Sequence, residues 1–196
     1  MTSRLRTLVG LALLLSVPSL GARADISSAL NPFSNFTNNV ARAAEANDVG
    51  RVRSLLTSGN NANQVAEDTQ RTGLHNAAIN GNIQIIAILI KAGARVDARD
   101  TIGNTPLIYA ADHDRVEIVK LLLDVGAQVD AENKNGMTAL MVAAKDGEAE
   151  MVRTLLARGA NPSKSDYTGR DSVGWALDSH RPAVIAVLKD AQAHKR

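Results

Sequence analysis

The side chains that could support acid–base or metal chemistry are few in this sequence. The four histidines are His75, His113, His180 and His194. No two of them show the short i, i+4 spacing that a helical metal site needs. Asp178, Ser179 and His180 are the residue types of a catalytic triad, but consecutive side chains point in different directions, whereas triad members converge through the fold. The sequence therefore predicts neither a metal site nor a catalytic centre.

Carboxylates and glycines also lack a catalytic arrangement. Asp97, Asp100 and Asp130 recur at similar places along the chain, which is typical of turn residues that bond nearby backbone rather than of paired acid–base catalysts. No glycine-rich phosphate loop is present. The chain has no cysteine, so disulfides, thiolate metal sites and a cysteine nucleophile are excluded. We expect no enzymatic activity and no cofactor.

The first 24 residues have the features of an export signal. Arg4 and Arg6 precede an apolar run over residues 8–17, and Ala22-Arg23-Ala24 follows a break in that run. This predicts a signal peptide over 1–24, cleaved near Ala24, and a periplasmic or secreted mature chain. A membrane-spanning helix needs about 20 apolar residues, so an uncleaved anchor is the weaker alternative, and no later segment is apolar enough to insert.

Charge argues against nucleic acid as the partner. The complete chain has 22 basic and 20 acidic residues and an isoelectric point near 9.1. Loss of residues 1–24 removes three arginines and no acid, which leaves 19 basic against 20 acidic residues, a net charge of −1. No large basic field then remains to hold nucleic acid or an anionic membrane.

The chain repeats itself with a period of 33 residues. Ala77, Ala110, Ala143 and Ala176 share this spacing, as do Gly93, Gly126 and Gly159. An earlier copy, one residue out of step, places Ala43 and Gly59 at the same two positions. The sequence therefore contains about five copies, at 36–66, 67–99, 100–132, 133–165 and 166–196.

The residue pattern of each copy predicts two short helices. The first helix begins after a residue whose side-chain oxygen can accept from free amides, namely Thr72, Thr105, Thr138 or Asp171. It ends at a position that suits a left-handed backbone, occupied by Asn47, Gly81, Asp114, Gly147 and His180. The second helix shows an apolar stripe, as in Ile83, Ile86, Leu89 and Ile90, or Val116, Val119, Leu122 and Leu123. One unit cannot bury such a stripe alone, so the units must stack.

These motifs resemble the ankyrin repeat family. The third copy carries DTIGNTPLIYAA at 100–111 and VEIVKLLLDVGA at 116–127, both similar to the family pattern. The resemblance covers about residues 40–190 and implies an all-α repeat solenoid with hairpin-like links, over residues 40–196. It also implies that His75 bonds neighbouring backbone. Lys189 stands at a position of the second helix that is apolar in the earlier copies, as expected of an end unit that meets water.

The ends of the array are altered. The first copy lacks the Thr-Pro-Leu type of helix start, and the fifth has Asp171-Ser172-Val173 with Pro182 at its second helix. We therefore expect an array that is complete within this chain, and a monomer. Residues 25–39 either form a leader that partly caps the first unit or are disordered.

The resemblance implies a protein partner bound on a concave surface of link tips and first-helix ends. The residues at these positions are Arg71, Ile79, Ile102, Asn104, Asp112, His113, Met137, Lys145, Tyr167 and Arg170. Ile79, Ile102, Met137 and Tyr167 are apolar or aromatic there and form a candidate anchor line, although single exposed apolar residues are ordinary. Trp175, in contrast, fits packing between units.

Three functions remain in competition at this level. The first is an exported module that docks a partner protein, as an inhibitor or immunity-type protein or as a scaffold or protective accessory. The second is a secreted effector that acts on a host protein through the same chemistry. The third is an enzyme with its site on the links, for which the sequence offers no converging set of side chains.

Overall fold

The computed structural model describes residues 39–194, and these form an array of paired helices. Over this range there are ten α-helices and, apart from two isolated bridges that join Val65 to Thr72 and Ser165 to Asp171, no strand pairing. The helices are α3 (Val40–Glu45), α4 (Val49–Thr57), α5 (Gly73–Asn80), α6 (Ile83–Lys91), α7 (Pro106–Asp112), α8 (Val116–Asp124), α9 (Ala139–Asp146), α10 (Ala149–Ala157), α11 (Ser172–Asp178) and α12 (Pro182–His194). The predicted all-α repeat solenoid is confirmed.

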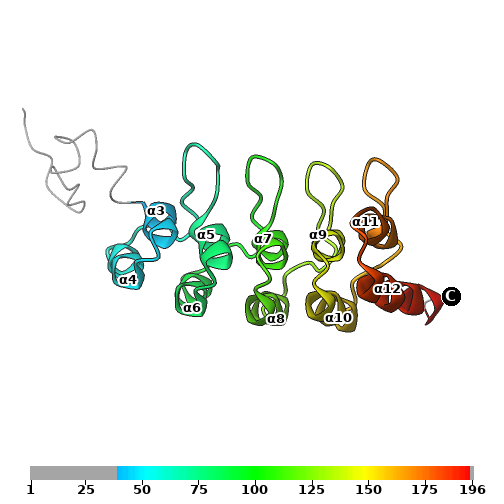
Figure 1. The fold of residues 1–196 in the computed structure, drawn as a ribbon. Coiled ribbons are helices and arrows are strands. Elements are labelled where there is room, and N and C mark those ends of the chain that lie inside the picture. The colour runs from blue at the N-terminus through cyan, green and yellow to red at the C-terminus, as the bar shows by residue number, and fades with distance from the viewer. Residues whose placement is uncertain (1–38, 195–196) are drawn as a thin grey trace, which may run out of the picture. The chain divides into compact units, whose positions relative to one another are not determined.

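The helices form two rows (Figure 1). The inner helices α3, α5, α7, α9 and α11 contact one another in sequence order, and each contacts the outer helix that follows it. The outer helices are α4, α6, α8, α10 and α12, and of these α6 and α8 approach each other less closely than the other neighbours. The links between repeats extend from the inner row, on the side away from the outer row.

Side-chain caps begin the inner helices at the predicted residues. The Oγ1 atoms of Thr105 and Thr138 accept from the amides of Ile108 at 3.3 Å and Met141 at 3.4 Å. Asp171 Oδ1 accepts from the Gly174 amide at 2.8 Å. Because the first amides of a helix have no partner within it, such caps stabilise the start. The sequence prediction of these starts is confirmed.

The inner helices also end where the sequence predicted. Gly81 and Gly147 have φ of +78° and +86°, and Asn47, Asp114 and His180 have φ between +52° and +58° at the equivalent position. A left-handed residue reverses the chain into the outer helix, and glycine adopts it without a steric penalty. The turn is therefore shared by all five repeats despite its varied side chains.

The core lies between the two rows. Ala77, Ala110 and Ala143 are fully buried on the inner helices, and Leu89 and Leu122 are fully buried on the outer ones. Small residues on the inner helices permit the close approach of neighbouring repeats, so each outer stripe is covered by the stack. Most of the predicted apolar stripe is thus confirmed.

One residue of the predicted stripe lies at the surface instead. Ile83 is 49% exposed, whereas Ile85, which the pattern did not select, is fully buried. Ile83 is the first residue of α6 and lines an open pocket beside α8, whereas the first residues of α8 and α10, Val116 and Ala149, pack partly against the core. The apolar spacing alone did not distinguish the two positions.

The fifth repeat has an altered outer face, and the sequence predicted only part of this change. Lys189 is exposed, as expected for an end unit. Leu177, however, is 50% exposed at the position that buried alanines occupy in the inner repeats, namely Ala78, Ala111 and Ala144. This end face therefore carries one large apolar side chain among its polar residues.

The segments predicted to be a signal peptide (1–24) and most of the leader (25–38) lie outside the described residues. Among residues 39–194, no helix has the length and apolar character to cross a membrane.

Candidate protein-binding surface

The tips of the links are joined to one another by backbone hydrogen bonds. The amide of Thr101 donates to the Thr69 carbonyl, that of Lys134 to the Ile102 carbonyl and that of Tyr167 to the Asn135 carbonyl, each at 3.1 Å. These six residues stand at two equivalent positions in successive repeats. The tips therefore form a regular ladder in which each link is held by the next.

Carboxylates and an amide fix the shape of the links of the third, fourth and fifth repeats from inside. Asp100 Oδ1 accepts from the Asn104 amide at 2.9 Å, Asn133 Oδ1 accepts from the Met137 amide at 3.1 Å, and Asp166 Oδ1 accepts from the Arg170 amide at 3.0 Å. This confirms the structural interpretation of Asp100. Asp97 and Asp130 differ from the prediction, because they bond amides of the following repeat, Gln128 at 3.1 Å and Asn161 at 2.9 Å.

His75 is a structural residue in the interior. The Thr72 amide donates to its Nδ1 at 3.1 Å, so the proton lies on Nε2, which donates to the Asn104 carbonyl at 3.0 Å. Burial lowers the pKa of this imidazole, although the bond to Asn104 opposes the shift. The ring thus ties α5 to the next link, as the resemblance implied.

The other described histidines do not assemble a site. His113 Nδ1 donates to the Tyr109 carbonyl at 3.1 Å, and His180 Nδ1 donates to the Asp178 carbonyl at 3.2 Å. Asp178 Oδ2 pairs with Arg170 Nη1 at 2.7 Å and is therefore not oriented toward His180 as a triad would require. Among residues 39–194 no group of three potential ligands is placed to hold a metal ion.

Arg71 forms a polar cluster with the following repeat. Its Nη2 donates to the Tyr109 hydroxyl at 2.7 Å, and its guanidinium carbon lies 4.6 Å from the centre of that ring. The hydroxyl in turn donates to Asp100 Oδ2 at 2.7 Å. Burial raises the pKa of Tyr109, and the bond to Asp100 raises it further. The phenol is therefore a neutral bridge between a cation and a buried carboxylate.

A related cluster forms within the fifth repeat. The Arg170 guanidinium carbon lies 4.3 Å from the centre of the Trp175 ring, and Trp175 Nε1 donates to Asp166 Oδ2 at 3.1 Å. Arg170 also reaches Asp178 on α11 and so joins the link to the end of its inner helix. Sequence reasoning missed both clusters. The available signal was an aromatic residue at the position of Tyr109 and Trp175, nine residues after a link carboxylate.

Comparison with known families gives a match over most of the described chain. A family model for ankyrin repeats (3 copies) matches residues 40–133 and 125–196. The chain belongs to the ankyrin repeat family. Ankyrin repeats are typically protein–protein interaction modules without catalytic activity. A curated relative is the potassium channel AKT3 of Oryza sativa subsp. japonica, 33% identical over 64 residues, which are 33% of this chain and 7% of the channel's length.

Most of the predicted partner-binding residues lie on the ankyrin links and at the ends of the inner helices, where they are exposed or half-buried. We call the surface at these residues the tip face, and it comprises Arg71, Ile79, Ile102, Asp112, His113, Met137, Lys145, Tyr167 and Arg170. Within single repeats, the Arg170–Asp178 pair and the contact between the rings of Tyr109 and His113, whose centres lie 6.4 Å apart, join link or helix residues to the end of the inner helix. Ile102 and Tyr167 are 53% and 73% exposed, whereas Ile79 and Met137 are half-buried.

Asn104 does not lie on this surface, contrary to the prediction. It is only 9% exposed, and its Oδ1 accepts from Asn133 Nδ2 at 2.9 Å. Its backbone carbonyl is also the partner of His75. The side chain points along the stack toward the next link rather than outward, because each ankyrin link is covered by its neighbour. Asn104 therefore connects repeats.

The centre of the tip face carries mixed charges. Asp112, His113 and Lys145 are exposed at the ends of α7 and α9, and Asp146 is half-buried beside them. Burial raises the pKa of the Asp146 carboxyl; the nearby Lys145 opposes this shift and repulsion from Asp112 adds to it. Such an arrangement favours partners with complementary charges in a particular register over a simple basic or acidic ligand.

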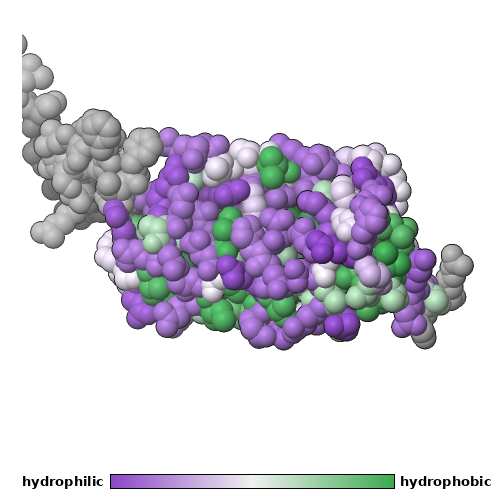
Figure 2. Space-filling view, viewed as in Figure 1, coloured by the Kyte–Doolittle hydropathy of each residue, from purple (hydrophilic) through white to green (hydrophobic). Residues whose placement is uncertain are grey.

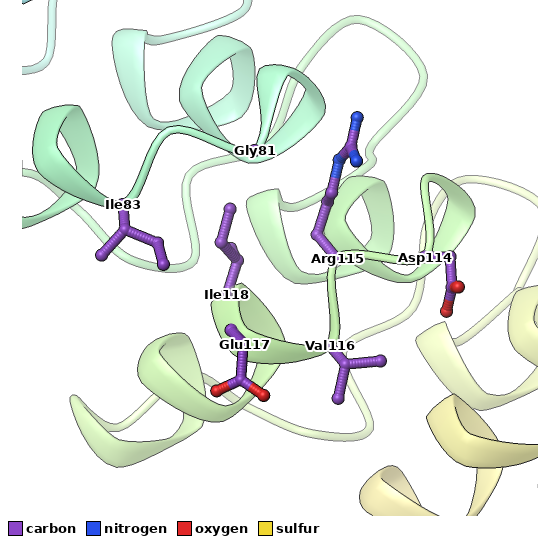
Figure 3. A pocket seen from close by; sticks show the side chains of 7 residues that line it. All are labelled: Gly81, Ile83, Asp114, Arg115, Val116, Glu117 and Ile118. Atoms are coloured by element: carbon purple, nitrogen blue, oxygen red, sulfur yellow. The ribbon is translucent and has the colours of Figure 1, made fainter.

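A shallow pocket of about 260 Å³ lies elsewhere, at the turns of repeats 2 and 3. It is lined by Gly81, Ile83, Asp114, Arg115, Val116, Glu117 and Ile118 (Figure 3). Ile83 and Ile118 face each other across it, while the side chains of Arg115, Asp114 and Glu117 diverge. It lies where α6 and α8 approach less closely. Diverging charged groups provide no converging set for catalysis.

The view in Figure 2 shows that hydrophilic side chains cover much of this side of the array, with apolar residues in separate patches. Separate apolar groups within a polar surround are the usual arrangement of the rim and anchors of a protein interface. The exposed large apolar residues of the described chain are Ile83, Ile102, Val125, Tyr167 and Leu177. Only Ile102 and Tyr167 among them belong to the tip face.

Proposed function

We propose that this chain is an exported, non-enzymatic module that docks a folded partner protein on its tip face. The observation that carries the proposal is the ladder of link tips, because it holds Ile102 and Tyr167 at fixed positions in the third and fifth repeats. An interface of standard size buries about 1,200–2,000 Å², and a surface that spans several repeats can supply its share. The family supports protein binding in general.

Tyr167 has the properties of an interface anchor. It is 73% exposed, yet its amide is bound to Asn135 and its ring lies against the backbone of Gly136. An aromatic side chain that is already ordered loses little conformational entropy on binding. Ile102 occupies a neighbouring position on the tip two repeats earlier, so the two side chains are apolar anchors on either side of the polar tip of the fourth repeat.

The proposal is tested by a pull-down from the organism's own envelope extract. The bait carries Ile102→Asp together with Tyr167→Asp, and each substitution replaces an exposed apolar group by a charge on the tip face. We expect loss of the partner that the unaltered chain retains. Met137 is left unchanged because it packs partly against the core, so its replacement by a charge would confuse binding with folding.

A matched control is available on the outer helices. Ile83 and Val125 are 49% and 39% exposed, and neither lies on the tip face. The variant with Ile83→Asp and Val125→Asp introduces the same two charges at side chains that are also exposed, though less so than Tyr167. Retention of the partner by this control and loss by the tip-face variant support the proposal. Equal retention by both variants, with unchanged circular dichroism, contradicts it.

Export is the second part of the proposal and rests on residues 1–24. The positive start, the apolar run at 8–17 and Ala22-Arg23-Ala24 support cleavage near Ala24. N-terminal sequencing of the chain from an envelope fraction should begin at Asp25. Replacement of Leu13 and Leu14 by Arg should leave the precursor uncleaved inside the cell, since the apolar run is interrupted. Cleavage and release of that variant would contradict the assignment.

The proposed module has two forms that differ in their effect on the partner. An inhibitor or immunity-type protein forms a one-to-one complex in which an enzyme loses activity. A scaffold or protective accessory leaves its partner active, and deletion then lowers survival under stress such as peroxide. Assay of the captured partner with and without the chain distinguishes the two. We expect the unbound chain to be a monomer, which light scattering can measure.

A further inference from the structure

Two Asn-Gly dipeptides occur in the sequence, Asn80-Gly81 and Asn135-Gly136. In this dipeptide the backbone nitrogen of glycine can attack the side-chain amide carbon of asparagine, because glycine has no Cβ to hinder the approach. Both glycines have positive φ, +78° in each case. Their amides are also both bonded, Gly81 to the Ala78 carbonyl at 3.4 Å and Gly136 to the Asn133 carbonyl at 3.0 Å. The Gly81 amide is also directed at the Ala77 carbonyl at the end of α5, so the two sites differ in their helix or link setting and in the asparagine side chain.

Asn80 is held in place by the preceding repeat. It is the last residue of α5, and its Nδ2 donates to the carbonyls of Ala44 and Glu45, both at 3.1 Å. Rotation of this amide toward the Gly81 nitrogen would break both bonds and leave two carbonyls at the end of α3 without a side-chain donor. The first repeat thus protects Asn80 from reaction.

Asn135 lies in a different setting, at the tip of the link that opens the fourth repeat. It is exposed, and within residues 39–194 no hydrogen bond to its side-chain amide is found. Its backbone, in contrast, is fixed: the amide donates to Asn133 Oδ1 at 2.9 Å and the carbonyl accepts from Tyr167 at 3.1 Å. The reactive group is therefore free while the surrounding backbone belongs to the tip ladder.

We propose that Asn135 is a site of spontaneous deamidation on the tip face. The Gly136 nitrogen forms a bond to Asn135 Cγ, the bond from Cγ to the side-chain nitrogen breaks, and ammonia leaves with the proton of the Gly136 amide. Water then opens the resulting succinimide. Attack at the side-chain carbonyl gives aspartate, and attack at the backbone carbonyl gives isoaspartate. Overall, water is consumed and one ammonia is released.

The reaction alters the part of the tip face that holds Tyr167. Aspartate adds a negative charge next to Lys134, and isoaspartate lengthens the backbone between Asn133 and Gly136. The bond from Tyr167 to residue 135 and the turn bond of Gly136 then lose their geometry. A weaker hold on Tyr167 would reduce partner binding, and this consequence rests on the proposed function. The deamidation of Asn135 does not depend on the proposed function.

The test compares the two dipeptides within one chain. The full chain is incubated at mildly alkaline pH, digested with trypsin and analysed by mass spectrometry for conversion of amide to acid at each asparagine. In the folded chain we expect Asn135 to react faster than Asn80 by on the order of tenfold, because two hydrogen bonds protect Asn80. In guanidinium chloride, where both bonds are absent, the two rates should become similar. The variant Asn135→Gln should lose the signal at residue 135.

Two results would overturn the proposal. One is a folded chain in which Asn80 reacts as fast as Asn135 or faster, and the other is a folded chain in which Asn135 does not react although it does in guanidinium chloride. Binding is measured separately, with Asn135→Asp and the isoaspartate-containing chain against the captured partner. Unchanged binding would remove the consequence for the tip face, while the mass measurement would still decide the chemistry.

Discussion

The hydroxyl of Tyr109 lies between Arg71 Nη2 and Asp100 Oδ2, at 2.7 Å from each. Arg71 comes from the second repeat, whereas Tyr109 and Asp100 belong to the third. The side chain of Asp100 is almost completely buried, and its direct distance to Arg71 Nε is 3.7 Å. The phenol therefore completes an ion pair that connects two repeats and whose acidic partner has little access to water.

Tyr109→Phe should lower the free energy of unfolding by about 1–3 kcal/mol. The ring packing is kept, but the buried Asp100 loses the hydrogen bond from the hydroxyl and the half-buried Arg71 loses its two donations to it. Urea denaturation followed by circular dichroism measures the change. Tyr167→Phe is the control, because that hydroxyl is on an exposed ring and its removal should have little effect. A similar loss in both variants would contradict the role assigned to the Tyr109 hydroxyl.

Ser172→Ala should stabilise the chain by about 1 kcal/mol. The hydroxyl of Ser172 is fully buried and, among the described residues, has no hydrogen-bond partner, so its desolvation is uncompensated. Ala139 stands at the equivalent position of the fourth repeat. The measurement is the urea midpoint, with the exposed Ser163→Ala as a reference. A lower midpoint for the Ser172 variant would show that the hydroxyl has a stabilising partner.

Gly136→Ala and Gly169→Ala separate backbone strain from the contact with Tyr167. Both glycines have similar positive φ, +78° and +84°, so alanine costs about 1 kcal/mol or more of strain at each. At Gly136 a Cβ would also lie 2.7 Å from the Tyr167 ring and 2.9 Å from its amide nitrogen, whereas at Gly169 it would meet nothing within 4 Å. Gly136→Ala should therefore be the more destabilising, as measured by thermal unfolding. Equal loss would mean that the tip adjusts freely.

Stability should fall below about pH 6.5 because of His75. Burial lowers the pKa of this group in the folded chain, so the unfolded chain, with a histidine pKa of about 6.5, binds more protons as the pH decreases. The stability that depends on neutral His75 is complete above that pH and is lost as the pH falls through it.

The measurement for His75 is the difference in unfolding free energy between pH 7 and pH 5. His75→Gln keeps an acceptor for the Thr72 amide and should reduce the pH dependence. His113→Gln is the control, since His113 is exposed. If the unfolding free energy of the unaltered chain and that of the His75 variant change equally with pH, His75 does not contribute to the pH dependence.

The local elements of the fold were determined by the sequence. Thr105, Thr138 and Asp171 cap helices, and Gly81 and Gly147 reverse the chain, because each acts on backbone within a few residues of itself. A 33-residue period then requires that every repeat form the same two helices. The same argument placed Ile102 and Tyr167 on exposed tips, and both are exposed.

Contacts between repeats were decided only by the tertiary structure. The period shows which positions are equivalent, but it does not show how far a side chain reaches along the stack. Arg71 therefore could not be matched to Tyr109, thirty-eight residues away, and Asn104 was placed on the surface although it bonds Asn133 in the next repeat. Ile83 is exposed beside the pocket between the starts of α6 and α8, and Leu177 is exposed because, among the described residues, no repeat follows the fifth to cover it. The stacking geometry of the repeats, rather than residue type, determines these contacts and exposures.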